Sequence, residues 1–359
     1  MAAASSRMVQ LQSLTQFYTW ARAPFIVSAP MRVLSGAHLA VAVSRAGGLG
    51  FIGPGADPKD TMTELDKARD LLDKDPLKTP TALDLLPVGV GFQTWNGNLD
   101  VASLAIEKHR PSAAWLFAPR HGQRELDDWT RGIRKVSPAT RIWIQVGTLR
   151  EAIDAAESSD SPDVLVIQGA EAGGHGRAND AIGLITLLPE IQDALRSKGI
   201  PLFAAGGIAD GRGVTAALGL GAAGVVMGTR FLASTEARIS KGYQDEILRA
   251  KDGASSTART QLYNHLRGTF DWPEQFSPRT ITNKSWEEHQ EGVPFEKLKK
   301  RHDELLKKGD EAWGDQGRTA TYAGANIGLI HEVKGAGLIL DEVRREAGEI
   351  IRSLQFINQ

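Results

Sequence analysis

The chain has 359 residues, of which 42% are hydrophobic and 24% charged, as is typical of a globular enzyme with a large core. Its formal net charge of −1 excludes the global electrostatic field with which proteins hold nucleic acid or an anionic membrane surface. The sequence contains no cysteine, which excludes disulfides, thiolate metal sites and a cysteine nucleophile.

Residues 1–23 form an N-terminal extension, for which we predict a short surface helix that leads into the first strand. The extension lacks the long apolar core of a secretory signal, and no apolar run in the chain reaches the roughly 18 residues of a membrane span. We therefore expect a cytoplasmic protein with no membrane partner. The serine and arginine content of the extension, with no acidic residue, leaves a mitochondrial location as the alternative.

Eight short apolar runs alternate with helical patterns between residues 24 and 235, which we predict to form one domain. They lack the polar alternation of a half-exposed strand, so each is predicted as a parallel strand covered on both faces. Eight strand–helix units predict an α/β fold, a closed (β/α)8 TIM barrel, in preference to a doubly wound open sheet. The runs cover residues 24–30, 48–53, 86–92, 112–119, 141–147, 163–169, 201–207 and 223–229.

The composition changes in residues 236–359, which are rich in charge and carry several tryptophans. We predict an additional, mainly helical C-terminal segment with a loop-rich middle, packed on or over the barrel. Its run KLKKRHDELLKKGDE mixes positive and negative charges, which indicates a solvated helix face and not a nucleic-acid patch. The sequence shows no cluster of metal ligands, and it leaves open whether this segment is a lid or a structural cap.

Glycines follow the seventh and eighth predicted strands, where many barrel enzymes bind phosphate. Gly206 and Gly207 follow the seventh strand, and Gly228 and Thr229 follow the eighth. Backbone amides at such positions approach an anion closely, and the helix beginning near Gly211 is expected to add its positive end. The alternative is that these glycines only make tight turns, but their occurrence after both strands favours phosphate binding.

The stretch QGAEAGGHGRAND (168–180) places His175 among glycines directly after the sixth predicted strand. Glycine at a strand end costs backbone entropy, so its presence indicates a tight turn or a ligand lying against the backbone. Histidine takes up a proton near neutral pH and is the commonest general base. We therefore predict that His175 is catalytic, although a lone histidine is more often structural.

Several of these motifs together resemble the nitronate monooxygenase family, whose members are FMN-dependent barrel enzymes. The resemblance covers most of the chain, and FMN-dependent enoyl-ACP reductases share much of it. It is carried by PFIVSAPM (24–31), HLAVAVSRAGGLGFIG (38–53), QGAEAGGH (168–175), AAGGIADGRGV (204–214), GAAGVVMGTRF (221–231) and YAGANIGLI (322–330).

The resemblance implies roles for individual residues. His175 would face the substrate above the flavin, and Gln145 would make a polar contact to the flavin, although a satisfied polar residue at a strand end is an equally good interpretation of Gln145. The implied FMN contacts are Ala29, Pro30 and Met31 along the isoalloxazine ring, Gly173 and Gly174 beside it, and Gly206, Gly207, Gly228 and Thr229 at the phosphate.

Two positions depart from the family pattern. Bacterial relatives usually carry an asparagine after the third strand, where this chain offers Gly91, which we keep as a flavin contact, and Gln93. A small residue often follows the methionine of the first strand, where this chain has Arg32. Phe92 and Trp95 are candidates for the wall of the substrate pocket.

The resemblance implies FMN-dependent oxidation of nitronates by O2 to carbonyl compounds and nitrite, through a flavin semiquinone. His175 would either remove the carbon proton of a neutral nitroalkane or hold the nitro group of a nitronate. Two alternatives stay open, an NAD(P)H-dependent FMN reductase similar to an enoyl-ACP reductase, and a flavin-free barrel that binds a sugar phosphate or nucleotide. The expected partners are a small nitronate and O2, and the oligomeric state is left open.

Overall fold

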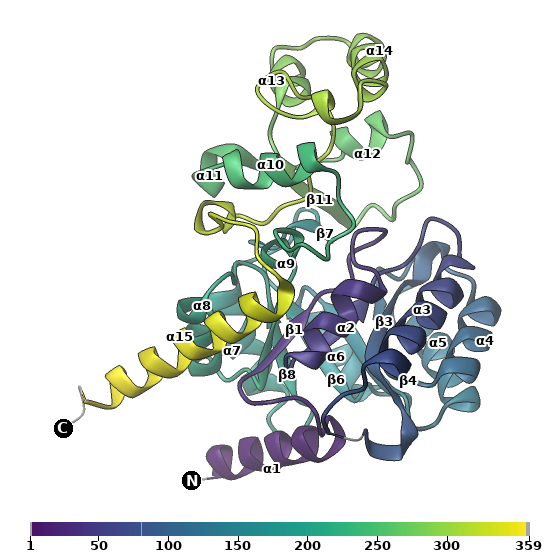
Figure 1. Ribbon diagram of the computed structural model, residues 1–359, viewed down its shortest axis with the longest axis vertical. Helices are drawn as coiled ribbons and strands as arrows, with labels where there is room; N and C mark the ends of the chain where they lie inside the picture. Colours follow the sequence, from purple (N-terminus) through teal and green to yellow (C-terminus); the bar gives the residue numbers. More distant parts are fainter. Residues whose placement is uncertain (1, 80, 357–359) are drawn as a thin grey trace.

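Eight parallel strands close into a barrel at the centre of the computed structural model, which describes residues 2–79 and 81–356. Each strand pairs with the next barrel strand along the chain, and the last pairs with the first (Figure 1). All eight apolar runs predicted as strands are strands, which confirms the (β/α)8 TIM barrel. The strands are β1 (Phe25–Ser28), β2 (Leu49–Ile52), β3 (Leu86–Gln93), β4 (Pro111–Phe117), β5 (Arg141–Val146), β6 (Val164–Gln168), β8 (Leu202–Ala205) and β9 (Gly224–Met227).

Helices cover the outside of the barrel, and one of them comes from far along the chain. The helix that follows the last strand, α9 (Thr229–Leu232), has four residues. The ring is completed by α15 (Ala336–Phe356), which packs against α8 and α2 (Figure 1). The division of the chain at residue 235 stays a prediction, and α15 lies beyond it. The other helices of the ring are α2 (Ala37–Arg45), α3 (Asp60–Lys74), α4 (Leu99–His109), α5 (Gln123–Val136), α6 (Leu149–Glu157), α7 (Leu184–Ala194) and α8 (Gly211–Gly219).

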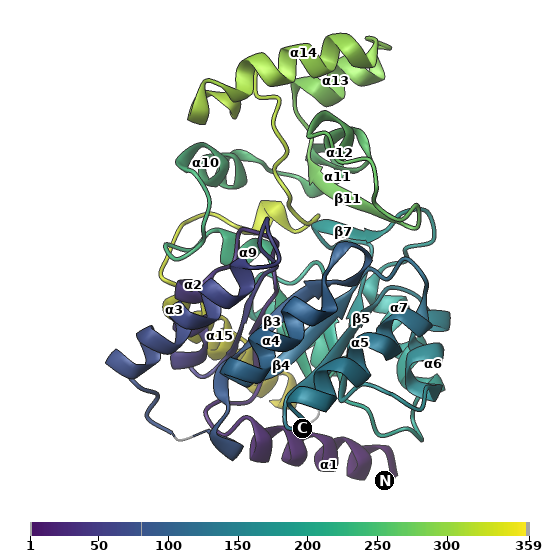
Figure 2. The ribbon, with the colours of Figure 1, turned by 90° about the vertical axis from the view of Figure 1, so that its right-hand side faces the viewer.

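Aromatic side chains fill the barrel interior below the strand ends that carry the candidate site. The ring of Trp143 lies 4.6 Å from that of Phe203 and 5.4 Å from that of Phe51, measured between centroids. The Trp143 indole donates to the hydroxyl of Tyr18, 2.8 Å away. Tyr18 follows α1 (Ala2–Phe17), which lies across the opposite end of the barrel from residues 241–306 (Figure 2). The predicted N-terminal helix therefore exists, and the residues that follow it close one end of the barrel.

The segment after α9 contains helices, as predicted, and also two strands that the sequence did not indicate. Together with β7 (Gly174–Arg177), which comes from the predicted loop after β6, these two strands form a three-stranded antiparallel sheet in the order β10-β11-β7. The stretch around His175 is therefore a short strand, because it pairs with residues about 100 positions later. The elements are α10 (Lys241–Arg249), α11 (Gly253–Ser256), β10 (Thr257–Arg259), α12 (Leu262–Leu266), β11 (Phe276–Ile281), α13 (Lys284–Gln290) and α14 (Phe295–Leu306).

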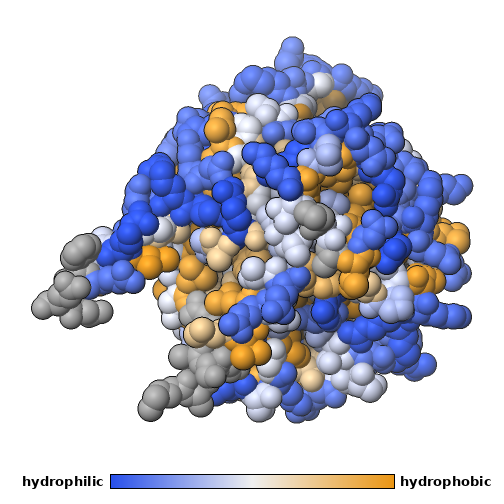
Figure 3. Space-filling model, turned by 60° about the horizontal axis from the view of Figure 1, so that its bottom comes forward, coloured by the Kyte–Doolittle hydropathy of each residue, from blue (hydrophilic) through white to orange (hydrophobic). Residues whose placement is uncertain are grey.

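The outer surface is mixed in polarity. Figure 3 looks at the end of the molecule that carries α1, and shows hydrophobic side chains there interspersed among hydrophilic ones. Within residues 2–79 and 81–356, no helix combines the length and the apolar character that crossing a membrane requires.

Candidate active site

A cavity of about 560 Å³ lies where the barrel strands end and the C-terminal segment covers them. This is the end of a barrel at which enzymes of this architecture carry their active sites, and the volume suits a bound cofactor with a small ligand. The barrel contributes residues that end or follow seven of its strands, and the C-terminal segment contributes side chains between residues 243 and 326. The segment is thus part of the wall of the cavity.

The structure brings almost all of the predicted site residues to this one cavity. The exception is Gly91, where a β-carbon would lie 2.4 Å from Cβ of Pro30. Glycine at this position allows Pro30 to pack on β3, and Gly91 itself does not line the cavity. The predicted residues that do line it are Ala29, Pro30, Met31, Gln145, Gly173, Gly174, His175, Gly206, Gly207, Gly228 and Thr229.

The two glycine-bearing loops present free backbone donors. Gly206 and Gly207 have φ of 107° and 73°, values that L side chains rarely adopt, and this conformation bends the chain directly after β8. The backbone amides of Gly206, Gly207, Gly228 and Thr229 donate to no other described residue. Because buried amides are nearly always paired, four free ones at a cavity indicate a site for an anion.

The N-terminus of α8 does not add to this site, contrary to the expectation from the sequence. The amide of Gly211 donates to a carboxylate oxygen of Glu346 at 2.8 Å, and those of Arg212 and Gly213 donate to Asp210 at 3.0 and 3.2 Å. Glu346 belongs to α15, whose position could not be inferred from the sequence. These carboxylates satisfy the first amides of α8, so those amides are not available to an anion in the cavity.

The three positions around His175 are glycine for different structural reasons. A β-carbon at Gly173 would lie 2.4 Å from the backbone nitrogen of Gly324, so glycine is required there by the packing of the C-terminal segment. Gly174 has a φ of 68° and open space around its α-carbon, as expected of a turn beside a cavity. At Gly176, a β-carbon would lie 2.7 Å from Oε1 of Gln168, whose amide nitrogen donates to the carbonyl of His175.

Two arginines of the C-terminal sheet hold the loop that carries His175. Arg259 donates to the carbonyls of Ala172 and Gly174, at 2.9 and 3.2 Å, and Arg279 donates to the carbonyl of Ala170 at 3.1 Å. Burial, together with the charge of Arg279, lowers the pKa of Arg259 to about 10. Sequence reasoning missed both arginines, since nothing in the sequence around them marks them as partners of a loop 85 to 109 residues earlier.

His175 is enclosed by side chains of the C-terminal segment. Its ring stacks on that of Trp272, with 3.6 Å between centroids and 9° between planes. Its Nε2 lies 3.1 Å from Oδ1 of Asn264, and the Tyr322 ring is 5.8 Å away. Trp272, Asn264 and Tyr322 all line the cavity and were missed by sequence reasoning. Trp272 was visible in the sequence only as one of several tryptophans in a charged stretch.

His175 is neutral at physiological pH. Burial lowers its pKa to about 3, and the positive charges of Arg259, Arg267 and Arg32 add to this, while the contact with Asn264 opposes it. The side chain is half-buried in the wall of the cavity and packed among other side chains, so the charged form loses part of its hydration. The ring is therefore a hydrogen-bonding group with one free lone pair, and its basicity depends on what occupies the cavity.

The cavity carries an excess of positive charge. Arg32 forms no hydrogen bond or ion pair with another described residue, and burial followed by the charge of Arg267 lowers its pKa. Arg267 donates to the hydroxyl of Tyr322, whereas Lys299 pairs with Asp303. Three cationic side chains thus face one carboxylate around the cavity. Such a field attracts an anionic ligand.

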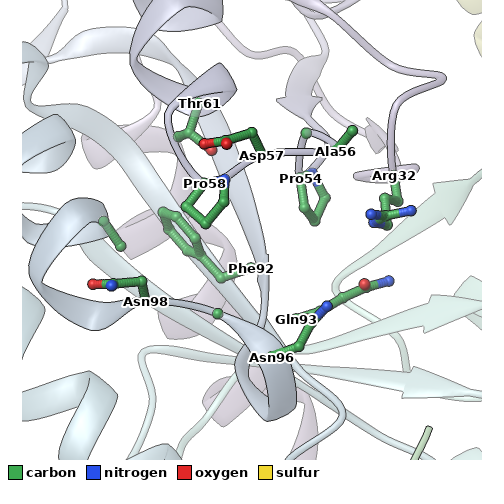
Figure 4. Close-up of a pocket in the computed structure, with 13 residues that line it drawn as sticks. Arg32, Pro54, Ala56, Asp57, Pro58, Thr61, Phe92, Gln93, Asn96 and Asn98 are labelled. Carbon is green, nitrogen blue, oxygen red and sulfur yellow. The ribbon is translucent and has the colours of Figure 1, made fainter. Parts of the chain in front are cut away.

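A smaller cavity of about 60 Å³ adjoins the large one, and Arg32, Gln93 and Asn96 line both (Figure 4). Figure 4 shows Arg32 and Gln93 reaching toward one another at one end of it, with Phe92 at the other. Phe92, which was a candidate wall residue, does not line the large cavity, while Trp95 does. The departure from the family pattern at Arg32 thus lies in the cavity itself.

Gln145 fits both interpretations that the sequence left open. Its Oε1 accepts a hydrogen bond from the indole of Trp115 at 3.0 Å, so the amide oxygen is satisfied. The residue also lines the cavity, and its amide nitrogen donates to no other described residue. Gln145 is therefore held in place by Trp115 and retains a donor for a ligand.

A profile of the nitronate monooxygenase family matches residues 133–344. The nitronate monooxygenase npaC of Metarhizium robertsii is 61% identical over 343 residues, which cover 96% of each chain. A nitronate monooxygenase of Neurospora crassa is 34% identical over 374 aligned positions, covering 98% of this chain and 96% of that one.

Two solved structures have a similar fold. FabK from Thermotoga maritima superposes with a TM-score of 0.73 at 27% identity, over 96% of this chain and 98% of its own. The nitroalkane oxidase of Streptomyces ansochromogenes superposes with a TM-score of 0.72 at 24% identity, over 95% of this chain and 99% of its own. These similarities extend through the C-terminal segment as well as the barrel.

Proposed function

Because the chain belongs to the nitronate monooxygenase family, and is therefore an oxidoreductase that acts on nitro compounds, we propose that it binds FMN in the large cavity and oxidises nitronates with O2. The products are a carbonyl compound and nitrite. Four free backbone amides beside a cationic, histidine-bearing cavity carry this proposal.

The residues around the cavity fit FMN. The free amides of Gly206, Gly207, Gly228 and Thr229 would hold its phosphate, as backbone donors after the last two barrel strands commonly do. The Thr229 hydroxyl accepts from the amide of Gly324 at 3.0 Å, so its own proton remains available for a phosphate oxygen.

The residues that follow β1, next to Gly228, and Gln145 of β5 offer contacts for the flavin ring. Ala29, Pro30 and Met31 follow β1 and line the cavity, and would lie along the isoalloxazine ring. Gln145 would donate to it through the amide nitrogen that Trp115 leaves free. When bound, FMN supplies the transfer of electrons from the nitronate and the reaction with O2. The protein supplies binding, orientation and electrostatics.

The charges of the cavity favour an anionic substrate. Arg32 and Arg267 have no carboxylate partner among the described residues, and both line the cavity. A nitronate is the anion of a nitroalkane, so these side chains attract it and orient its charged end. A neutral nitroalkane gains less from the same arrangement.

His175 acts on the substrate in one of two ways. As a neutral ring it accepts the carbon proton of a nitroalkane, or it orients the nitro group of a nitronate that is already deprotonated. A base with a pKa of about 3 removes a carbon proton slowly, because efficient bases have a pKa near the working pH. We therefore expect preformed nitronates to be much better substrates than the parent nitroalkanes.

A second candidate function is favoured by the likeness to FabK at 27% identity. In that case the protein would be an NAD(P)H-dependent FMN reductase, and the cavity would admit a nicotinamide beside the flavin. A third, flavin-free binding of another phosphate ligand would use the same backbone amides.

The test is a visible absorption spectrum of the FMN-loaded protein, recorded without oxygen. We expect propionate 3-nitronate to bleach the oxidised flavin band within the time of a turnover, and NADPH to leave it unchanged. Bleaching by NADPH alone supports the reductase and excludes nitronate oxidation as the main activity. A protein that stays colourless after reconstitution with FMN supports the flavin-free alternative.

A further inference from the structure

A chain of hydrogen bonds connects His175 to a backbone carbonyl in the C-terminal sheet. The amide nitrogen of Gln261 donates to the carbonyl oxygen of Phe276 at 2.7 Å. The amide nitrogen of Asn264 donates to Oε1 of Gln261, also at 2.7 Å. Oδ1 of Asn264 lies 3.1 Å from Nε2 of His175. Each contact uses one end of a side-chain amide and leaves the other end for the next.

The chain of contacts has one direction, because a backbone carbonyl only accepts hydrogen bonds. The group of Gln261 that faces Phe276 must therefore be the amide nitrogen, which leaves Oε1 of Gln261 as an acceptor. Asn264 must donate to that oxygen, and its own Oδ1 then faces His175. Since an amide oxygen cannot donate, the proton between the two residues belongs to Nε2 of His175.

The surroundings keep these side chains in place. Asn264 is 2% exposed and lies in α12, whose neighbouring Tyr263 donates to Oδ1 of Asn283 at 2.8 Å. The ring of His175 is held against Trp272 by stacking. Reversal of the Asn264 amide would place its oxygen against Oε1 of Gln261, so that two acceptors would face each other without a proton between them, which is costly in a buried site.

We propose that Gln261 and Asn264 are positioning residues that hold His175 as the Nε2–H tautomer, so that Nδ1 presents its lone pair to the cavity. No described residue bonds to Nδ1, so this nitrogen is the ring atom available to a ligand. The assignment of Nδ1 as the base rests on the proposed function, whereas the tautomer itself follows from the hydrogen bonds alone.

The tautomer matters for one step. When a neutral nitroalkane is bound, its carbon–hydrogen bond breaks, the electron pair remains on the substrate as the nitronate, and the proton forms a bond to Nδ1. The ring becomes an imidazolium that keeps its contact with Asn264. A preformed nitronate has no such proton to lose, so its oxidation does not depend on which nitrogen carries the hydrogen.

The first test reads the tautomer directly by NMR of protein labelled with 15N in its histidines. The signals of His175 are those lost in His175→Asn, and the two-bond couplings to ring protons identify the protonated nitrogen. We expect Nε2–H at neutral pH in the wild type, and a change toward the Nδ1–H form in Gln261→Leu. Gln275→Leu is the matched control, because Gln275 also donates to a backbone carbonyl, that of Pro119, but has no link to His175.

Nδ1–H in the wild type, or an unchanged tautomer in Gln261→Leu, overturns the proposal. This readout needs neither FMN nor substrate, so it stands even if the protein proves to oxidise no nitronate. Should Gln261→Leu not fold, Asn264→Asp is the second variant. Its carboxylate still accepts from Nε2–H, and it offsets the charges of Arg32, Arg259 and Arg267, so both ring nitrogens are expected to carry protons at a higher pH than in the wild type.

The second test separates the two substrates. In Gln261→Leu we expect kcat for a neutral nitroalkane to fall about five- to tenfold, as for the loss of one orienting hydrogen bond. We expect kcat/KM for the preformed nitronate to stay within about twofold. Equal losses on both substrates, with an unchanged circular dichroism spectrum, overturn the positioning role.

Discussion

The two sides of the cavity are built in different ways. The side formed by the loops after β8 and β9 uses backbone amides, and its glycines lie within 25 residues of one another in the sequence. The side around His175 uses side chains from the C-terminal segment, and the contact of His175 with Asn264 joins residues 89 positions apart. Both sides belong to one cavity, yet only the first is formed by residues that all lie close together in the sequence.

The difference has a physical basis. A backbone anion site needs only a chain that turns where strands end, so glycine and a hydroxyl at the right spacing suffice. A side-chain network needs each partner at hydrogen-bonding distance and in one orientation, which distant elements provide only after they have packed. The two sides should therefore respond differently to substitution, the first in cofactor affinity and the second in turnover.

The largest effect is expected at His175, on the side of the cavity that is built from side chains. His175→Asn should lower kcat for a neutral nitroalkane about a hundredfold or more, because a positioned base contributes roughly 10²–10⁴ in rate. The loss on a preformed nitronate should be much smaller. Steady-state kinetics with both substrates measures how much kcat falls for each of them. Equal losses would mean that His175 acts mainly by orienting the nitro group.

A substitution in the loops that follow β8 and β9 should weaken cofactor binding. Gly206→Ala forces an L side chain to a φ of 107° and places Cβ 3.1 Å from the backbone nitrogen of Ala172. Strain of about 1–3 kcal/mol should relax the loop and weaken FMN about tenfold or more, as measured by quenching of FMN fluorescence. Gly221→Ala carries a comparable strain, at the same φ of 107° with Cβ 3.2 Å from Cγ of Gln192, but lies outside the cavity and should leave FMN affinity unchanged. Equal weakening in both would indicate general destabilisation.

Arg32 follows β1 of the barrel and lines the cavity, where we propose that it attracts the substrate. Arg32→Ala should raise KM for a nitronate about five- to tenfold with little change in kcat, because it removes an attraction that ground state and transition state share. The increase should shrink at high salt. Arg345→Ala, on the exposed face of α15, is the control. A lower kcat at unchanged KM would contradict the assignment.

The smallest effect concerns stability against pH. His175 has a pKa of about 3 in the folded protein, below its ordinary value near 6.5 in an unfolded chain. The unfolded state therefore binds a proton that the folded state does not as the pH falls below about 6.5, and stability falls with it. The charged groups facing the ring, Arg32, Arg259 and Arg267, all oppose its protonation.

Urea unfolding at pH 7 and pH 5 measures this dependence. His175→Asn lacks the group and should lose less stability over the same interval than the wild type. Identical losses in the two proteins would show that the ring is protonated in the folded state, and that it is less shielded than the structure indicates.

The barrel could be predicted from the sequence because its information is local. Each strand is a short apolar run without polar alternation, and burial of both faces follows directly from that pattern. The same holds for Gly206, Gly207, Gly228 and Thr229, whose position after two neighbouring strands brings them together in any closed barrel. His175 could be identified because it follows a strand and stands among glycines.

Contacts between distant segments were beyond the reach of the sequence. Glu346 caps α8, Pro278 pairs with His175 in the sheet, and Gly173 is glycine because the backbone at Gly324 passes against it. None of these leaves a periodicity or a spacing that a single sequence displays, since each partner depends on where a separate element packs.

The sequence by itself therefore determined the barrel, the glycine-bearing loops after β8 and β9 and the place of His175 beside them, because strand burial and turn geometry depend on neighbouring residues. The tertiary structure decided that α15 completes the ring of helices, that Trp272 and Asn264 contact His175, and that Gln261 bonds to Asn264 behind it. The physical reason is that a tautomer and a lowered pKa are properties of an environment, and that environment exists only after segments about 90 residues apart have packed together.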